Sequence, residues 1–517
     1  METESANNKR IAKNALLLYF RMFITMAVSL YTSRVILKAL GVEDFGIYNV
    51  VGGVVTMLTF INTAMGSASQ RYITFELGHK NYKQLYTVFC TSVEVHILIA
   101  IIIAILSETI GIWFLNTHME IPSLRLEAAN WVYQFSILSC IVSILYVPFN
   151  ATIIAHEKMS AFAYISIIEV LLKLIIVYML MLSEIDRLIL YSILIFSIQL
   201  FIFIIYVTYC ICHFPETRFK FIFDKQLFKN MISYASWSLI GNLAIVACTQ
   251  GLNILLNIFW GPIVNAARAI AAQVQNAIYS FGSNFQTAIN PQITKNFATG
   301  NIKQMHNLIF VSCKYSFFLL FFLSLPIIIE TKEILTIWLG VVPNHSINFL
   351  RITLLSAIIS STLNPILIAV QATGKIKRYQ MINGSLQLSI LPISFIFLNI
   401  GAPPESVFIV HLCISIIISM TKLLIAKSLI SISIKVFLYR VIFKIILVCI
   451  IAPIIPILIY NYLPPNILSF SLVIFICLIS TAGFIYTIGT ENEEKIFIKN
   501  KINNILKSKR KKHSTIF

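Results

Sequence analysis

Long apolar runs separated by short polar breaks are the feature that most limits what this chain can fold into. Each run is close to the ~20 residues that cross a bilayer as a helix, whereas strands of a membrane barrel would alternate over about 10 residues. Of the 517 residues, 58% are hydrophobic and 12% are charged, against about 25% charged in a soluble domain. We therefore predict an all-α integral membrane protein with about fourteen spans, which have the approximate limits 12–40, 46–76, 86–115, 126–154, 159–182, 188–212, 230–259, 263–290, 305–328, 347–373, 379–400, 405–427, 436–460 and 466–488.

Basic residues are concentrated in alternate loops. The segments "NNKRIAK", "GHKNYK" and "ETRFKFIFDKQLFK" and the C-terminal "KNKINNILKSKRKKH" are basic, whereas the intervening loops are short and poor in Lys and Arg. The positive-inside rule then places both termini in the cytoplasm, which requires an even number of spans. The distribution of the net charge of +18 is therefore explained by membrane topology, and no nucleic-acid partner is expected. The basic tail could also contact anionic membrane lipids.

Two pairs of segments indicate an internal repeat. "YKQLYTVFCTS" resembles "IKQMHNLIFVS", and "PFNATIIAHEK" resembles "PILIAVQATGK", so spans one to six align with spans seven to twelve. We predict two six-helix lobes related by a pseudo-twofold axis along the membrane normal, plus two C-terminal helices. The predicted boundaries are 1–212 for the N-lobe, 213–229 for a cytoplasmic linker, 230–428 for the C-lobe, 429–490 for spans thirteen and fourteen, and 491–517 for a basic cytoplasmic tail.

Four spans carry polar residues at intervals of three and four, which places these residues on one face of a helix. Because a polar group that faces lipid lacks a hydrogen-bond partner, these faces should turn toward water or protein. Spans one and two correspond to seven and eight in the repeat, so we expect the four faces to line a shared central cavity. Close helix packing is the alternative. The candidate cavity residues are Arg21, Thr25 and Ser29 in span one, Asn49, Thr56, Thr63 and Gln70 in span two, Asn242, Thr249 and Asn253 in span seven, and Asn265, Arg268, Gln275, Asn276 and Tyr279 in span eight.

Four further ionisable residues fall inside apolar spans. Glu94 and Lys314 are equivalent in the repeat and are expected near mid-membrane, where an ionisable group is a functional candidate. Glu94, close to His96, is our candidate for a proton or sodium site, with a neutral packing role as the alternative. Glu169 and Lys173 are four residues apart, which favours a structural ion pair over a role in ion coupling.

Three segments resemble a known family. They are "NALLLYFRMFITMAVSLYTSRVILKALGVEDFGIYNVVGGVVTML", "GSASQRYITFELG" and "GPIVNAARAIAAQVQNAIYSFGSNFQTAINPQITKNFATG". They are similar to polysaccharide-biosynthesis transporters of the multidrug/oligosaccharidyl-lipid/polysaccharide exporter superfamily, and most similar to bacterial O-antigen and capsule flippases. The resemblance covers nearly the whole chain.

The resemblance implies a two-lobed bundle in the bacterial cytoplasmic (inner) membrane that works by alternating access. Its implied substrate is an oligosaccharide on undecaprenyl pyrophosphate, moved from the inner to the outer leaflet, with a glycan polymerase and glycosyltransferases as possible partners. Members carry cationic residues in the central cavity, and Arg21 and Arg268 match that description. No bound cofactor is implied, although a proton or sodium gradient could drive transport.

The chemistry of such a substrate agrees with the polar faces. Pyrophosphate oxygens need cations, and guanidinium groups can donate two parallel hydrogen bonds to phosphate. Asn, Gln, Ser and Thr side chains can replace water around the sugar hydroxyls. A multidrug antiporter of the same superfamily is the main alternative, although a pocket for organic cations should favour acidic and aromatic residues.

A membrane glycan polymerase or ligase is a less favoured alternative, and a non-transporting scaffold for glycan assembly is a third. The longest outer loop, "TKEILTIWLGVVPNHS", lacks paired carboxylates, and no HExxH, GxSxG or Walker motif is present. The nine cysteines form no CxxC pair or Cys/His set, so neither a metal site nor catalytic residues are expected.

The topology can be tested by cysteine labelling. In a cysteine-free background, we expect Ser508→Cys to resist a membrane-impermeant thiol reagent in intact cells and to react after permeabilisation. Asn344→Cys, in the predicted outer loop, serves as the reactive control. Labelling of residue 508 from outside intact cells would contradict a cytoplasmic C-terminus.

Overall fold

The predicted spans are helices in the computed structural model of the chain. The structure describes residues 2–56, 60–118, 121–182, 184–222, 224–340, 342–464, 466–491 and 494–495, and within these ranges it contains helices and turns but no β-strand. Eleven helical segments of this described part are long and apolar enough to cross a membrane. The all-α membrane fold is therefore confirmed, while the count of fourteen spans stays a prediction.

The first helix contains the break between predicted spans one and two. α1 (Glu2–Thr56) consists of two helices joined at Gly41, whose φ of 82° lies in the region that favours glycine. α2 (Phe60–His79) continues predicted span two. The other helices of predicted spans three to six are α3 (Tyr82–Leu106), a π-helical turn (Ser107–Gly111), α4 (Ile112–His118), α5 (Leu126–Leu145), α6 (Val147–Ala155), α7 (Met159–Leu182) and α8 (Arg187–His213).

The remaining helices follow the predicted order. They are α9 (Lys225–Trp260), α10 (Pro262–Ala298), α11 (Ile302–Ile329), α12 (Thr331–Leu339), α13 (Ser346–Thr362), α14 (Asn364–Ala372), α15 (Lys377–Asn399), α16 (Glu405–Ile430), α17 (Ile434–Phe437), α18 (Phe443–Ile451), α19 (Ile454–Tyr462) and α20 (Ile467–Phe484). α10 is absent from the eleven apolar segments, because its polar face extends over much of its length.

The chain forms two compact units, each described by itself below. Unit 1 comprises Met1–Thr249, Asn284–Met305 and Leu367–Leu388. Unit 2 comprises Gln250–Ser283, His306–Ile366 and Ser389–Phe517. Both α9 and α10 contribute to each unit, so this division does not follow the boundary between the predicted lobes, which stays a prediction.

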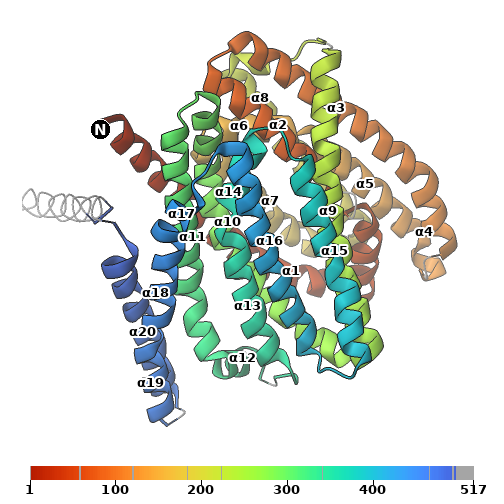
Figure 1. Cartoon of the computed structure of the whole chain (residues 1–517). Coiled ribbons are helices and arrows are strands. Elements are labelled where there is room, and N and C mark those ends of the chain that lie inside the picture. Colours follow the sequence, from red (N-terminus) through yellow and green to blue (C-terminus); the bar gives the residue numbers. More distant parts are fainter. Residues whose placement is uncertain are drawn as a thin grey trace, which may run out of the picture. The chain divides into compact units, whose positions relative to one another are not determined.

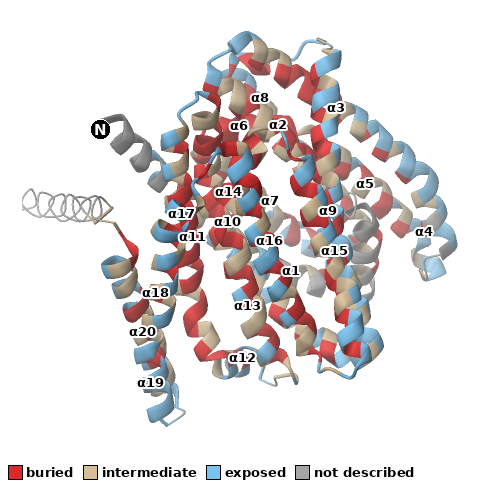
Figure 2. Ribbon diagram, in the orientation of Figure 1, coloured by how far each residue is buried: buried red, intermediate tan, exposed pale blue. Residues whose placement is uncertain are grey.

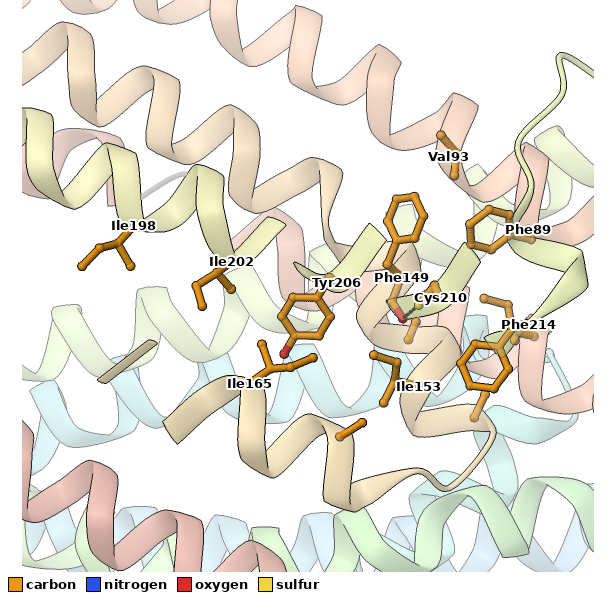
Figure 3. Packing of buried hydrophobic residues seen from close by; sticks show 14 of the residues in the cluster. Phe89, Val93, Phe149, Ile153, Ile165, Ile198, Ile202, Tyr206, Cys210 and Phe214 are labelled. Atoms are coloured by element: carbon orange, nitrogen blue, oxygen red, sulfur yellow. Dashed lines mark hydrogen bonds between the residues drawn. The ribbon is translucent and has the colours of Figure 1, made fainter. Parts of the chain in front are cut away.

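Aromatic and branched side chains of α3, α6, α7 and α8 form a core in unit 1 (Figure 3). Phe89 and Phe149 meet edge to face with ring centroids 5.3 Å apart, an arrangement that the aromatic quadrupole favours. Ile153, one turn beyond Phe149, is fully buried in the same cluster. This core fixes the end of α6, and therefore the position of the turn at residues 156–158 that follows it.

Unit 2 has its own aromatic packing. Phe349 of α13 and Phe408 of α16 lie with ring centroids 4.2 Å apart. α19 and α20 run side by side (Figure 1), and exposed residues are frequent along both (Figure 2). Many of these are apolar, such as Leu468 and Phe475 of α20. Exposed apolar side chains at these positions are suited to contact with lipid acyl chains.

Candidate functional site

Arg21 of α1 has a polar and aromatic environment in unit 1. Its guanidinium donates to Asn284 Oδ1 over 2.9 Å and to Ser166 Oγ over 3.4 Å. It also lies 4.5 Å from the ring centroid of Phe162, within the range of a cation–π contact. Its Nε–H is buried and has no hydrogen-bond partner among the described residues. Such an unmet donor favours an acceptor from outside the protein.

The other predicted cavity residues of unit 1 that the structure describes are half-buried or exposed. Thr25 and Thr249 donate to carbonyls of their own helices, at Met22 (3.0 Å) and Ile245 (2.8 Å) respectively. Ser29, Thr63 and Thr249 are exposed, and Gln70 and Asn242 are half-buried. The side chains of Asn49 and Thr56 lie outside the described residues.

Arg268 of α10 lies among amide side chains in unit 2. It donates to Asn253 Oδ1, and Asn265 donates to the carbonyl of Asn253 over 3.1 Å. The charge of Arg268 also acts on His411 of α16. Because Arg268 and His411 lie on different spans, their proximity could not be predicted from the sequence.

The remaining predicted residues of α10 lie further along the same helix. Gln275 is half-buried and Asn276 is exposed. Tyr279 is 37% exposed and accepts a hydrogen bond from Asn364 over 3.1 Å. Arg21 and Arg268 belong to different units, so a cavity that they share stays a prediction.

Glu94 contacts the segment between α8 and α9. Its Oε1 accepts the backbone N–H of Ile222 over 3.0 Å, and its Oε2 is buried without a partner among the described residues. His96 is fully buried and its Nδ1 pairs with the carbonyl of Ser92. The contact with a predicted cytoplasmic linker favours the packing alternative for Glu94 over a mid-membrane ion site. A coupling role stays a prediction.

The other ionisable candidates form ion pairs. Lys314 is 2% exposed, and its Nζ lies 2.7 Å from Oε2 of Glu494, just after α20 and its final turn. Glu169 and Lys173 form the pair that their spacing predicted, with Nζ 2.6 Å from Oε1. Lys314 thus fastens the end of the last helix to α11.

A buried carboxylate that the sequence analysis missed lies in the turn between α6 and α7. The Glu157 side chain is 1% exposed, and its Oε1 accepts from Lys295 Nζ over 2.7 Å. Its Oε2 accepts from Gln292 over 2.6 Å and pairs with Arg10 at 2.9 Å. Asn14 donates to its carbonyl. The backbone of Glu157 has a φ of 60°, a strained conformation for a residue with a side chain.

The Glu157 cluster joins segments that the repeat assigns to different lobes. Arg10, Asn14 and Glu157 come from the predicted N-lobe, and Gln292 and Lys295 from the predicted C-lobe. All five belong to unit 1. Because a buried carboxylate is costly without partners, these contacts hold α1, the α6–α7 turn and α10 together.

Two contacts of α2 lie within the same unit. Arg71 donates to the carbonyl of Ala372 at the end of α14, over 2.9 and 3.3 Å. Gly78 approaches α10 so closely that a Cβ there would lie 2.7 Å from Cβ of Ala298. Arg71 therefore links α2 to the end of α14, a contact that the sequence did not predict.

The linker is fastened to the same turn through His156. Its Nε2 lies 2.5 Å from Oε1 of Glu216. Burial raises the pKa of Glu216, but the hydrogen bond and the charge of His156, together with a backbone hydrogen bond, lower it by more, so the net pKa is lowered. Glu216 is thus held ionised beside the Glu157 cluster.

Comparison with solved structures identifies the fold. A crystal structure of MATE in the straight conformation matches with a TM-score of 0.68 and 13% identity, covering 82% of this chain and 96% of that one. The outward-facing conformation of a multidrug resistance MATE family transporter of the MOP superfamily gives 0.65 at 13% identity, over 81% of this chain and 96% of that one. A MOP superfamily transporter from Pyrococcus furiosus, described for the reverse polarity of its binding pocket, gives 0.64, again at 13% identity over 81% and 96% of the two chains. The protein is a multi-pass membrane protein with the fold of MOP-superfamily transporters.

A family model then narrows this class. The model described as Polysaccharide biosynthesis protein matches residues 11–299, which is more than half of the chain. The chain belongs to the polysaccharide biosynthesis protein family, which confirms the resemblance seen in its sequence. No curated protein shows significant sequence similarity to it.

The contact between α2 and α10 can be tested by crosslinking. In a cysteine-free background, we expect Gly78→Cys with Ala298→Cys to form a disulfide under mild oxidation, because small shifts bring the Cβ atoms to the ~3.5–4.5 Å that a disulfide requires. A protease site in the linker separates the two fragments on a gel. Adding Glu157→Gln should lower the yield, because charged hydrogen bonds worth about 1.5–3 kcal/mol are lost.

The control is Glu184→Gln, which removes an exposed carboxylate beyond the other end of α7. It should leave the crosslinking yield unchanged. A yield that Glu157→Gln does not alter would show that the cluster does not hold α2 and α10 together.

Proposed function

We propose that this protein is a flippase that moves an undecaprenyl-pyrophosphate-linked oligosaccharide, such as an O-antigen, capsule or exopolysaccharide repeat unit, from the inner to the outer leaflet. The observation that carries the proposal is the environment of Arg21. A half-buried guanidinium with an unmet, buried Nε–H, held by Asn284 and Ser166, suits a phosphate oxygen. Membership of the polysaccharide biosynthesis family supports a glycan substrate.

The second arginine supports the same chemistry. Arg268 lies among the amides of Asn253 and Asn265, groups that can hydrogen-bond both phosphate and sugar hydroxyls. We infer that Arg21 and Arg268, one from each repeat, hold the pyrophosphate of the substrate. The bacterial cytoplasmic membrane is the proposed site, with both termini cytoplasmic, a glycan polymerase and glycosyltransferases as partners, and a proton or sodium gradient as the driving force.

A multidrug or organic-cation antiporter is the second candidate, because its fold is the one that the structural comparisons share. The similar Pyrococcus furiosus transporter is described for the reverse polarity of its binding pocket, which was taken to suggest a different function. The polarity of the binding pocket therefore distinguishes a flippase from an organic-cation antiporter. The guanidinium groups of Arg21 and Arg268 favour an anionic substrate over an organic cation.

Deletion of the gene, followed by location of the lipid-linked glycan, tests the function. We expect the glycan to accumulate on the cytoplasmic side, where a membrane-impermeant glycosidase reaches it in inverted vesicles but not in spheroplasts. Glycan that stays accessible in spheroplasts of the deletion strain would contradict the flippase. Loss of resistance to cationic drugs with normal glycan export would favour the antiporter.

The two arginines can be tested in the complemented deletion strain. We expect Arg21→Ala and Arg268→Ala each to abolish export at limiting expression, because a lost charge-assisted bond of about 1.5–3 kcal/mol weakens binding roughly ten- to a hundredfold. Arg→Lys should be partly active, since it keeps the charge but loses the planar fork.

The matched control is Arg378→Ala, which removes an exposed guanidinium at the start of α15. It should export normally. Wild-type export by both alanine variants at Arg21 and Arg268, at equal protein level, would make these arginines structural.

A further inference from the structure

A cavity in unit 2 lies where the start of α12 meets the turn between α19 and α20. Its volume is about 580 Å³. By the topology that the basic loops predict, α11 ends at the outer side of the membrane, so this cavity faces the outer leaflet. Its polar lining includes Glu330, Lys332, Glu333 and Tyr460.

Two carboxyl groups line this cavity. Glu330, immediately before α12, is 3% exposed, and Glu333 follows within one helical turn. The quoted outer-loop segment holds one carboxylate, Glu333, and the start of α12 brings Glu330, one residue before that segment, close to it. Oε2 of Glu333 is buried and has no hydrogen-bond partner among the described residues.

The positive groups nearby leave the two carboxylates without an ion pair. Arg351 of α13 donates to the carbonyl of Ile328 and to Thr331 Oγ1. No Lys or Arg of the described residues forms an ion pair with Glu330 or Glu333. Burial and then the charge of Glu333 raise the pKa of Glu330 to about 7.

Two further titratable groups interact electrostatically with these carboxylates. Tyr460 of α19 interacts with both glutamates and with Arg351, and Cys477 of α20 interacts with Glu330. Lys332 lines the cavity but is exposed. The cavity therefore offers two acceptors, one of them deeply buried, and one exposed cation.

The rest of the lining selects among cationic ligands. Ile337, Ile467, Phe470 and Val473 supply apolar walls, and exposed apolar residues cover much of α20. A ligand that fits must therefore combine an N–H-bearing cation for the carboxylates, an anion for Lys332 and an acyl chain for the walls. Among membrane components, a phospholipid with a primary ammonium has all three groups.

We propose that this cavity binds an aminophospholipid of the outer leaflet, with its ammonium between Glu330 and Glu333 and its phosphate at Lys332. The primary ammonium donates up to three hydrogen bonds, and one of them meets the unpartnered Oε2 of Glu333. The lipid thereby ties α12 to the α19–α20 hairpin. This site does not depend on the proposed flippase activity.

The purified full-length protein tests the proposal by thermal unfolding and native mass spectrometry. The probes are phosphatidylethanolamine, phosphatidylcholine and phosphatidylglycerol, each with the same acyl chains. Phosphatidylcholine is the sharpest comparison, because it keeps the charges but its quaternary ammonium has no N–H donor. We expect phosphatidylethanolamine to stay bound to the protein in the mass spectra and to raise Tm more than either other lipid. Equal retention of phosphatidylcholine would overturn the proposal.

Variants then locate the site. Glu330→Gln and Glu333→Gln should each weaken the preference for phosphatidylethanolamine roughly tenfold, since each removes a charge-assisted bond. Glu184→Gln removes an exposed carboxylate elsewhere and should leave the preference unchanged. The readout is the difference between two lipids for one variant, so a general change in stability cancels. An unchanged preference in the double glutamine variant would overturn the assignment.

The pH dependence gives a second readout. A lipid ammonium, with a pKa near 10 as in lysine, stays charged between pH 6 and 8, whereas Glu330 ionises as the pH passes about 7. The preference for phosphatidylethanolamine should therefore increase from pH 6 to pH 8 in the wild type and stay flat in Glu330→Gln. A preference that is independent of pH in the wild type would exclude Glu330 as a ligand. Free phosphoethanolamine that protects as well as the lipid would exclude a lipid site.

Discussion

A charged group that leaves water must find a partner, and in a membrane protein this requirement decides which helices stay together. The Glu157 carboxylate is removed from solvent almost completely, and four side chains around it donate hydrogen bonds or pair with it or its backbone. Truncating Glu157 would leave Arg10 and Lys295 without their counter-charge, which is why such clusters are costly to break. The strained backbone of Glu157 is tolerated because the cluster and the aromatic core beneath α6 both fix this turn.

The same requirement distinguishes the arginines of unit 1. Arg71 lies over the end of α14 and donates twice to one backbone carbonyl, which a helix C-terminus leaves without a partner. It therefore acts within the protein. Arg21 is held by Asn284 and Ser166 but keeps a buried N–H that no described residue meets. The two guanidinium groups thus differ: Arg71 bonds the end of a helix, whereas Arg21 keeps a buried Nε–H that no described residue meets.

The helices could be predicted from the sequence because the signal is local. Apolar runs of the length of a membrane span indicate helices, because a backbone exposed to lipid must satisfy its hydrogen bonds within the helix. The break between spans one and two falls at Gly41, between the two predicted runs. The pair Glu169 and Lys173 was also predictable, since spacing on one helix is enough. The partner of Arg21 was not, because Asn284 is 263 residues away and no periodicity reports which helices touch.

A second reason explains why the environments of Glu157 and Glu94 could not be predicted from the sequence. Glu157 lies in "HEK", a polar loop that by pattern alone belongs in water, yet it is buried and contacts both α1 and α10. Glu94 was placed near mid-membrane by counting residues along one helix, yet the linker returns to contact it. A charged residue in a loop therefore does not reveal its own burial, since the loop can be exposed to water or can be packed between two helical segments. Glu330 and Glu333 show a further outcome, in which the first turn of one helix brings like charges together and the missing counter-charge must be a proton or a bound cation.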